Sequence, residues 1–211
     1  MDRNRAKTRL RLGAASLLTI TALAAVIAGP ASMAQANDSL FDNPSTTTAT
    51  GVFTFTTGSG VLPAWESAGI TLTPVAPATS STSSLAATTK ISLPVVAKTG
   101  TANATAGGFR LTNTKTKESV RCFLPTVDTR ARVIDCILDA GYNAALFTIN
   151  GIEGREFFGN SSYRTSVFTG MSISITSPQF AEILNDALST TVFSASVTVA
   201  TGDLTVTRRL P

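Results

Sequence analysis

Short stretches in which apolar and polar residues alternate recur along most of the chain, first at Val52 to Phe55 and again at Ile70 to Val75. Alternation with a period of two is typical of β-strands that bury one face. Further stretches of this kind lie at residues 90–96, 109–112, 120–124, 133–138, 145–149, 165–169, 171–175, 192–199 and 204–207. The pattern predicts an all-β domain, an antiparallel sandwich or open barrel of about ten short strands.

Two segments have the spacing of helices instead. After Ser177 and Pro178, a suitable N-cap and first-turn residue, apolar residues recur three and four positions apart as far as Leu188. A shorter segment over 62–68 is followed by Gly69, the residue type that most easily takes the left-handed conformation at a helix end. The sequence therefore predicts one or two short helices, the longer one lying on the sheet or at one end of it.

Three polar segments carry no such pattern. Residues 37–50 predict a loose N-terminal arm, and residues 78–89 and 98–106 predict loops because they are built almost entirely of small and polar residues. We expect a single β-rich domain over 51–211.

The start of the chain has the layout of a secretory signal peptide. Basic residues are followed by an apolar run from Ala14 to Ala28, and then by Ala34-Gln35-Ala36. Such a run rises about 22 Å as a helix, short of the roughly 30 Å hydrocarbon core of a membrane. We therefore expect residues 1–36 to be removed and the mature protein to be secreted or retained at the cell envelope, with no stable transmembrane segment.

Removing this leader changes the charge of the protein. The totals of 17 Lys and Arg and 13 Asp and Glu lose five basic residues and one acidic residue, which leaves 12 of each. A neutral domain has no general electrostatic attraction for nucleic acid or an anionic membrane, and neither is expected as a partner.

The chain contains no histidine. This excludes Ser-His-Asp and Cys-His catalysis and removes the commonest metal ligand. Two carboxylate pairs, Asp135 with Asp139 and Glu153 with Glu156, remain candidates for glycoside hydrolysis or calcium binding. Their spacing does not select such a role, and carboxylates near turns are usually solvated or capping residues. We expect a non-enzymatic protein without a metal site, and a divergent carboxylate hydrolase is kept as an alternative.

The two cysteines, Cys122 and Cys136, flank a predicted hairpin. Two thiolates without histidine complete no zinc site, and in an exported chain such a pair is most simply a disulfide. With the turn near Asp128, Leu124 is expected to face Ile134 across the two strands.

The segment REFFGNSSYRTSVF is the strongest candidate for a binding surface. Phe157 and Phe158 are adjacent and cannot both point to one face of a strand, so one is expected to be exposed beside Arg155, Tyr163 and Arg164. Aromatic rings with guanidinium groups suit a flat apolar ligand, a sugar or a protein partner. The alternative is a hairpin whose aromatic side chains pack against each other across the strands.

A series of motifs carries a resemblance to a family: ITLTPVAPAT, ISLPV, GGFRLTN, LFTING and FTGMSISITSPQFAEILNDAL, followed by a closing pair of strands. Over roughly residues 52–207, the chain resembles exported actinobacterial proteins related to the HtaA-type domain. That resemblance implies a β-rich domain outside the membrane and a role connected with haem uptake, in which a tyrosine binds the iron and a histidine supports it. Here the region after the mid-domain loop reads Ala106-Gly107-Gly108-Phe109, and only Tyr142 and Tyr163 are available as axial ligands.

The leading hypothesis is thus a secreted, non-enzymatic binding or structural protein of the bacterial envelope or exterior, with no cofactor. Its partner would be an envelope component, a protein or a small apolar ligand. The alternative is a protein that binds haem or another apolar small molecule through Tyr142 or Tyr163.

Overall fold

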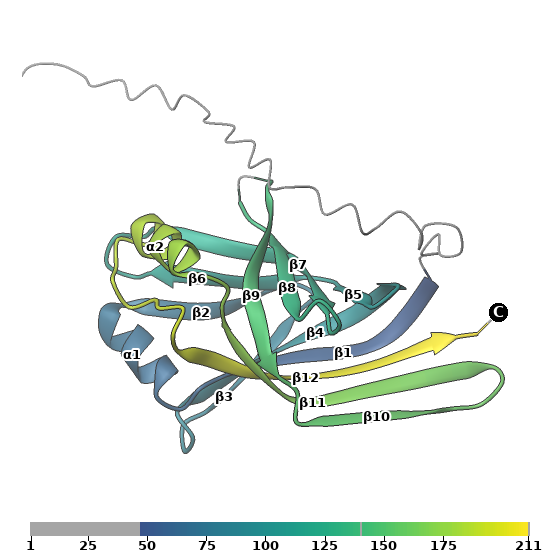
Figure 1. Cartoon of the computed structure of the whole chain (residues 1–211). Coiled ribbons are helices and arrows are strands. Elements are labelled where there is room, and N and C mark those ends of the chain that lie inside the picture. Colours follow the sequence, from purple (N-terminus) through teal and green to yellow (C-terminus); the bar gives the residue numbers. More distant parts are fainter. Residues whose placement is uncertain (1–46, 140, 211) are drawn as a thin grey trace, which may run out of the picture. The chain divides into compact units, whose positions relative to one another are not determined.

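Strands make up most of residues 47–139 and 141–210, which are the residues that the computed structural model describes. The predicted signal peptide and the first part of the predicted arm lie outside them. The strands are β1 Thr47–Thr57, β2 Ile70–Val75, β3 Thr79–Ser83, β4 Thr88–Thr99, β5 Ala102–Thr105, β6 Gly108–Asn113, β7 Ser119–Asp128, β8 Val133–Ile137, β9 Asn143–Gly151, β10 Gly154–Gly159, β11 Tyr163–Ile175 and β12 Thr198–Arg209. Two helices, α1 Val61–Ala68 and α2 Pro178–Ala187, complete the described elements (Figure 1).

Eight of the strands form a closed antiparallel barrel, in the order β1, β12, β11, β9, β8, β7, β5, β4 and back to β1. The ring closes because β7 pairs with β8 and also with β5. The other four strands extend it: β6 pairs with β7, β2 with β6, β3 with β4, and β10 with β11. The all-β prediction with short helices is confirmed, but a sandwich or open barrel of ten strands is wrong, because alternation along a strand does not reveal which strand lies beside it.

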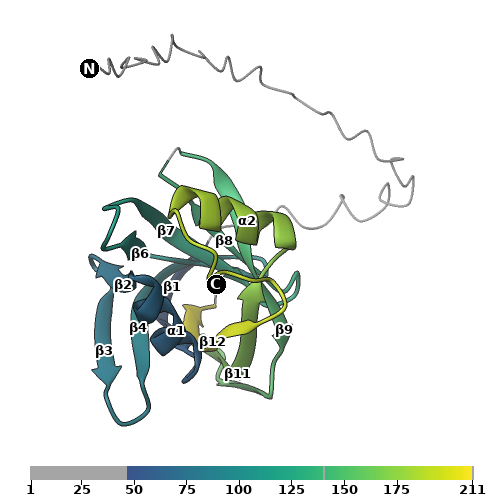
Figure 2. The ribbon, with the colours of Figure 1, turned by 90° about the vertical axis from the view of Figure 1, so that its left-hand side faces the viewer.

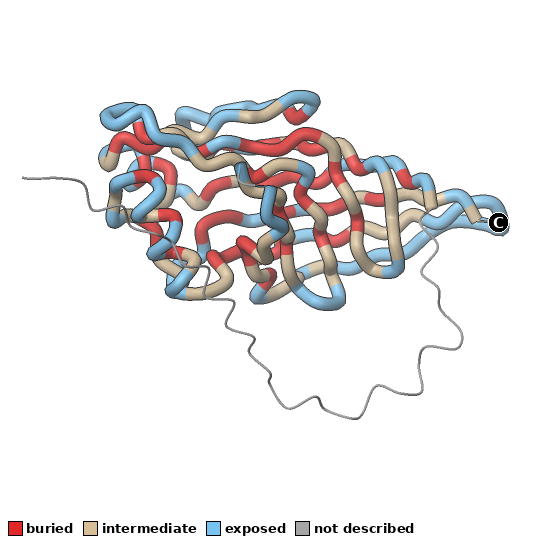
Figure 3. Tube along the Cα trace, turned by 90° about the horizontal axis from the view of Figure 1, so that it is seen from above, coloured by how far each residue is buried: buried red, intermediate tan, exposed pale blue. Residues whose placement is uncertain are grey.

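The inside of the barrel is filled by side chains. On β4, every second residue from Thr89 to Val95 is buried, and β1 contributes Phe53 and Phe55 to the same core. Three aromatic rings meet within the core, Phe55 with Phe109 at 5.4 Å, Phe55 with Phe147 at 5.6 Å and Phe109 with Phe147 at 6.0 Å between ring centroids. Figure 3 shows the buried stretches in the central parts of neighbouring strands, with exposed strand ends toward the C-terminus.

Both predicted helices are present. The Ser177 side chain accepts a hydrogen bond from the backbone N–H of Phe180 at 3.2 Å, and helix α2 begins at Pro178. Helix α1 buries Trp65 and ends at Gly69, whose φ of 86° is the left-handed conformation predicted for it. Figures 1 and 2 show α1 and α2 at the same end of the barrel.

The predicted loops and arm are partly strands. Strand β1 already begins at Thr47, β3 and the start of β4 lie within the predicted loop 78–89, and the end of β4 and all of β5 lie within 98–106. Strand β3 has the sequence TSSTS and is exposed along its whole length, so neither of its faces carries an apolar signal. It is held by its pairing with β4, which the sequence pattern does not contain.

The strand predicted over 192–199 is wrong for most of its length, since β12 begins only at Thr198. The side chain of Asn185 replaces a strand partner there: its oxygen accepts from the N–H of Phe193, and its nitrogen donates to the carbonyl of Phe193, both at 3.0 Å. The Phe193 ring packs on Trp65 with a centroid distance of 5.4 Å. The apolar Phe193 side chain therefore packs against α1 and is not part of a strand.

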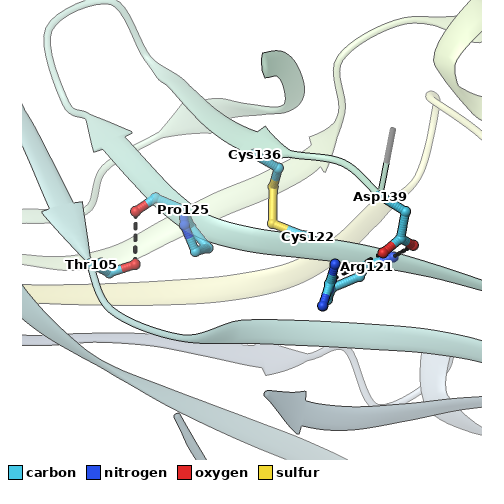
Figure 4. The surroundings of a disulfide bond; sticks show 6 residues. All are labelled: Thr105, Arg121, Cys122, Pro125, Cys136 and Asp139. Atoms are coloured by element: carbon cyan, nitrogen blue, oxygen red, sulfur yellow. Dashed lines mark hydrogen bonds and ion pairs between the residues drawn. A yellow bond between two sulfur atoms is a disulfide. The ribbon is translucent and has the colours of Figure 1, made fainter. Parts of the chain in front are cut away.

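The predicted disulfide joins Cys122 on β7 to Cys136 on β8, and both residues are buried (Figure 4). The register of this hairpin differs from the prediction. A bulge between Phe123 and Thr126 places Val127, not Leu124, opposite Ile134. At the bulge, the N–H of Leu124 donates to the carbonyl of Gly107 at 2.7 Å, on the side of β7 where β5 and β6 lie.

We expect the double substitution Cys122→Ser with Cys136→Ser to lower the free energy of unfolding by about 3 kcal/mol, because the bond closes a loop of roughly fifteen residues in the unfolded chain. Urea denaturation with and without a thiol reductant measures this. The reductant should shift the unfolding midpoint of the wild-type protein to a lower urea concentration and leave the midpoint of the double variant unchanged. Equal midpoints for oxidised and reduced wild-type protein would contradict the stabilising role.

Candidate functional site

A basic cavity of about 480 Å³ lies at the end of the barrel away from the helices. It is formed where β4, β10, β11 and β12 meet the turns after β4 and β7. The cationic residues that line it are Lys98, Arg130, Arg132, Arg155, Arg164 and Arg208. Among the described residues, no carboxylate lines this basic cavity.

The pairing of β11 with β12 explains why cations gather at this place. On β12, the inward positions run from Leu204 through Val206 to Arg208, and the first two are buried in the core. Arg208 lies directly opposite Arg164 of β11. Because side chains two positions apart share a face, both guanidinium groups lie on the inner surface of the sheet just beyond the core. The basic cavity is therefore the open end of the barrel interior.

Like charges on directly opposed strand residues repel each other. The cations of the cavity have no compensating ion pair among the described residues, where the salt bridge present joins Arg121 to Asp139 at 3.0 Å. The pKa of Lys98 is lowered, first by burial and then by the charge of Arg208, while Asp128 acts in the opposite direction. This end of the described domain thus concentrates positive charge, which Asp128 offsets only in part.

An exposed aromatic ring stands at the edge of the basic cavity. Phe157 of β10 is 63% exposed, and its ring meets that of buried Phe168 edge to face with centroids 5.9 Å apart. Phe157 is opposite Ser166, another cavity residue, across the β10–β11 pair. Cross-strand aromatic packing and an exposed ring, which the sequence offered as alternatives, are therefore both present.

The structure divides the residues predicted to bind a ligand among three places. Arg155, Phe157 and Arg164 line the basic cavity. Phe158 follows Phe157 and so points to the opposite face, as does Tyr163, which pairs with Arg209. Tyr142 is 72% exposed beyond the end of β8, near the end of the barrel that carries α2.

Sequence reasoning missed four of the cavity cations: Lys98, Arg130, Arg132 and Arg208. Each stands at the end of a strand or in a turn, with no local motif around it. Two of them lie more than 30 positions from the predicted segment, and only the closed topology brings them to it. The sequence does show basic residues at the ends of several predicted strands. They indicate a cationic site only if those strand ends lie together, and the sequence does not show which ends do.

The carboxylates considered for catalysis or calcium are not in the basic cavity. Asp139 forms an ion pair with Arg121 and accepts a hydrogen bond from the backbone N–H of the same residue at 2.9 Å. Burial, followed by the charge of Asp128, raises the pKa of Asp135. Within residues 47–139 and 141–210, no group of three or more acidic, cysteine or histidine side chains is placed to hold a metal ion. No helix in that same part is long and apolar enough to cross a membrane.

Comparison with known proteins gives little further information. No family model matches the chain, and no curated protein sequence matches it. A solved structure found to be similar is the haem-binding protein HtaB from Corynebacterium glutamicum, which is 13% identical, with a TM-score of 0.45 over 79% of this chain and 96% of that one. At this level of similarity, we draw no conclusion about this protein from it.

Because Arg208 faces Arg164, we expect Arg208→Gln to raise the free energy of unfolding by about 0.5 kcal/mol at low salt. The gain should shrink in about 0.5 M NaCl, which screens the repulsion. Urea denaturation at both salt concentrations measures it. Lys90→Gln is the control, since Lys90 is an exposed residue of β4 outside the cavity. A loss of stability in Arg208→Gln at low salt would show that its guanidinium has a stabilising partner.

Proposed function

We propose that this protein is a non-enzymatic binding protein that acts outside the cell and holds an anionic ligand in the basic cavity. The observation that carries the proposal is the cluster of six cations without a lining carboxylate among the described residues. A cluster of this kind is unfavourable in the free protein and becomes favourable when an anion binds. Proteins retain such destabilising arrangements where function requires them.

The size and chemistry of the cavity support this proposal. Its volume of about 480 Å³ is in the range of small-molecule sites. Five of the six cations are arginines, whose planar guanidinium groups bind carboxylate, sulfate or phosphate oxygens through paired hydrogen bonds. The cavity residues come from four strands and two turns and meet at one place. Cations that only raise the net charge of a surface do not need to be gathered in this way.

The setting outside the cell and the absence of catalysis are supported separately. The buried disulfide is of the kind that persists in oxidising compartments, in agreement with the signal peptide expected from the sequence. With no histidine in the chain and no carboxylate in the cavity among the described residues, the site lacks the imidazole and carboxylate groups that most often act as general acids and bases. This composition supports a binding role.

Haem is the alternative that the sequence resemblance supplies, through Tyr142 or Tyr163. Neither tyrosine lines the basic cavity. Tyr163 belongs to the outer face of β11, and Tyr142 is near the other end of the barrel. The described residues therefore do not offer a tyrosine oxygen to haem iron within the cavity, and we assign no role to the iron there.

Inorganic triphosphate is a suitable probe for the anion site, because it has high charge and no apolar part. We expect calorimetric titration at constant ionic strength to show saturable binding, weakened at least about tenfold in the double variant Arg164→Gln with Arg208→Gln. Lys90→Gln should bind as the wild type does. Equal affinity in all three proteins would contradict an anion site in the cavity.

Haemin, titrated in parallel, tests the alternative. A saturable Soret change that Tyr163→Phe or Tyr142→Phe abolishes, and that the double arginine variant leaves unchanged, would favour haem binding at a tyrosine over the proposed site.

A further inference from the structure

The basic cavity continues into a second cavity along the β10–β11 ribbon. The second, of about 500 Å³, is lined by Phe157, Phe158, Gly159, Asn160 and Arg164. It shares Phe157 and Arg164 with the basic cavity. The two cavities therefore form one elongated surface, strongly cationic toward the barrel and aromatic toward the tip of the ribbon.

The outer part of this surface is built around the edge strand β10. Phe157 and Phe158 point to opposite faces of the strand and are 63% and 51% exposed. Gly159 lies opposite Arg164, and a side chain at Gly159 would collide with the carbonyl of Tyr163. The bare backbone at this position leaves the Arg164 side chain without a cross-strand neighbour on β10.

Asn160 adds polar groups at the tip. Its side-chain oxygen accepts hydrogen bonds from the N–H groups of Ser162 and Tyr163, at 2.8 and 3.1 Å. These bonds fix the turn, while the side-chain nitrogen has no hydrogen-bond partner among the described residues. The tip thus offers amide donors beside two exposed aromatic rings.

This combination fits a saccharide better than a flat apolar ligand. Both cavities are open, so a bound molecule would stay partly in water, and its polar groups would remain hydrated. An exposed phenyl ring packs against the C–H face of a sugar ring while the hydroxyl groups face solvent or amide donors. The arginines and Lys98 at the inner end would bind acidic substituents.

We infer that the ligand is an anionic oligosaccharide, with an acidic group in the basic cavity and further sugar units passing over Phe157 toward the ribbon tip. This inference rests on the proposed function, because it identifies the class of anion that the same site takes. It adds the expectation that affinity rises with the length of the oligosaccharide, which a site for a simple anion would not show.

The test compares a sulfated hexasaccharide, the sulfated disaccharide of the same repeat and the unsulfated hexasaccharide, by calorimetry at constant ionic strength. We expect the sulfated hexasaccharide to bind at least about tenfold more tightly than the disaccharide, and the unsulfated chain to bind weakly. Phe157→Ala should remove most of the gain with length, so that its affinities for the sulfated hexasaccharide and disaccharide differ by less than about threefold. Phe157→Leu, which keeps apolar volume against Phe168, should lose the same gain. Tyr142→Ala, which removes an exposed aromatic ring elsewhere, should change neither affinity.

The outcomes separate this inference from the proposed function. If triphosphate binds but affinity for the sulfated chain does not rise with length, or if Phe157→Ala and Phe157→Leu retain the full gain, the oligosaccharide assignment is overturned and the anion site stands. If neither triphosphate nor any sulfated chain binds, both are overturned. Tighter binding of a single-stranded DNA oligomer with the same number of charges would also overturn the oligosaccharide assignment.

Discussion

Closure of the sheet is the constraint on which the rest of the structure depends. A short strand, β5, pairs with β4 on one side and β7 on the other, while β7 also pairs with β8, and the ring is completed. Once the ring is closed, every second side chain of eight strands points into one shared space. Large apolar residues fill that space, and the disulfide between β7 and β8 lies within the same core.

The same constraint creates the candidate site. The inward row of β12 changes from apolar to cationic between Val206 and Arg208, and the inward row of β11 does so between Phe168 and Arg164. Beyond the last apolar layer, these guanidinium groups lie on directly opposed residues, and Lys98 is near enough for the charge of Arg208 to lower its pKa. A barrel that served only stability would gain by alternating the signs of these charges. The uniform sign of the cavity's lining charges is the basis of our proposal that the ligand is anionic.

The sequence predicts those parts of the fold that depend on residues close together in the chain. Helix α2 follows from its N-cap and apolar spacing, and the disulfide follows from two cysteines around a hairpin in an exported chain. Phe157 was identified because two adjacent aromatic residues in a strand must point to opposite faces. In each case, the decisive contacts join residues near one another in the chain.

What could not be predicted depends on pairing between distant segments. Strand β3 has no apolar residue and exists through its hydrogen bonds to β4. Arg208 joins Arg164 across 44 positions of sequence, and Lys98 is still farther away. The periodicity of a single sequence contains no information about such neighbours. The predicted surface therefore included three residues of the basic cavity but omitted four of its six cations.

Mapping of an anion on the folded protein by two-dimensional NMR tests the central claim most directly. In a titration with inorganic triphosphate, backbone amide signals of residues around Lys98, Arg164 and Arg208 should shift together with a single dissociation constant, while those around Trp65 and Tyr142 stay in place. Shifts that are spread evenly over the exposed cations, or that centre on the helical end of the barrel, would contradict the assignment of the basic cavity as the binding site.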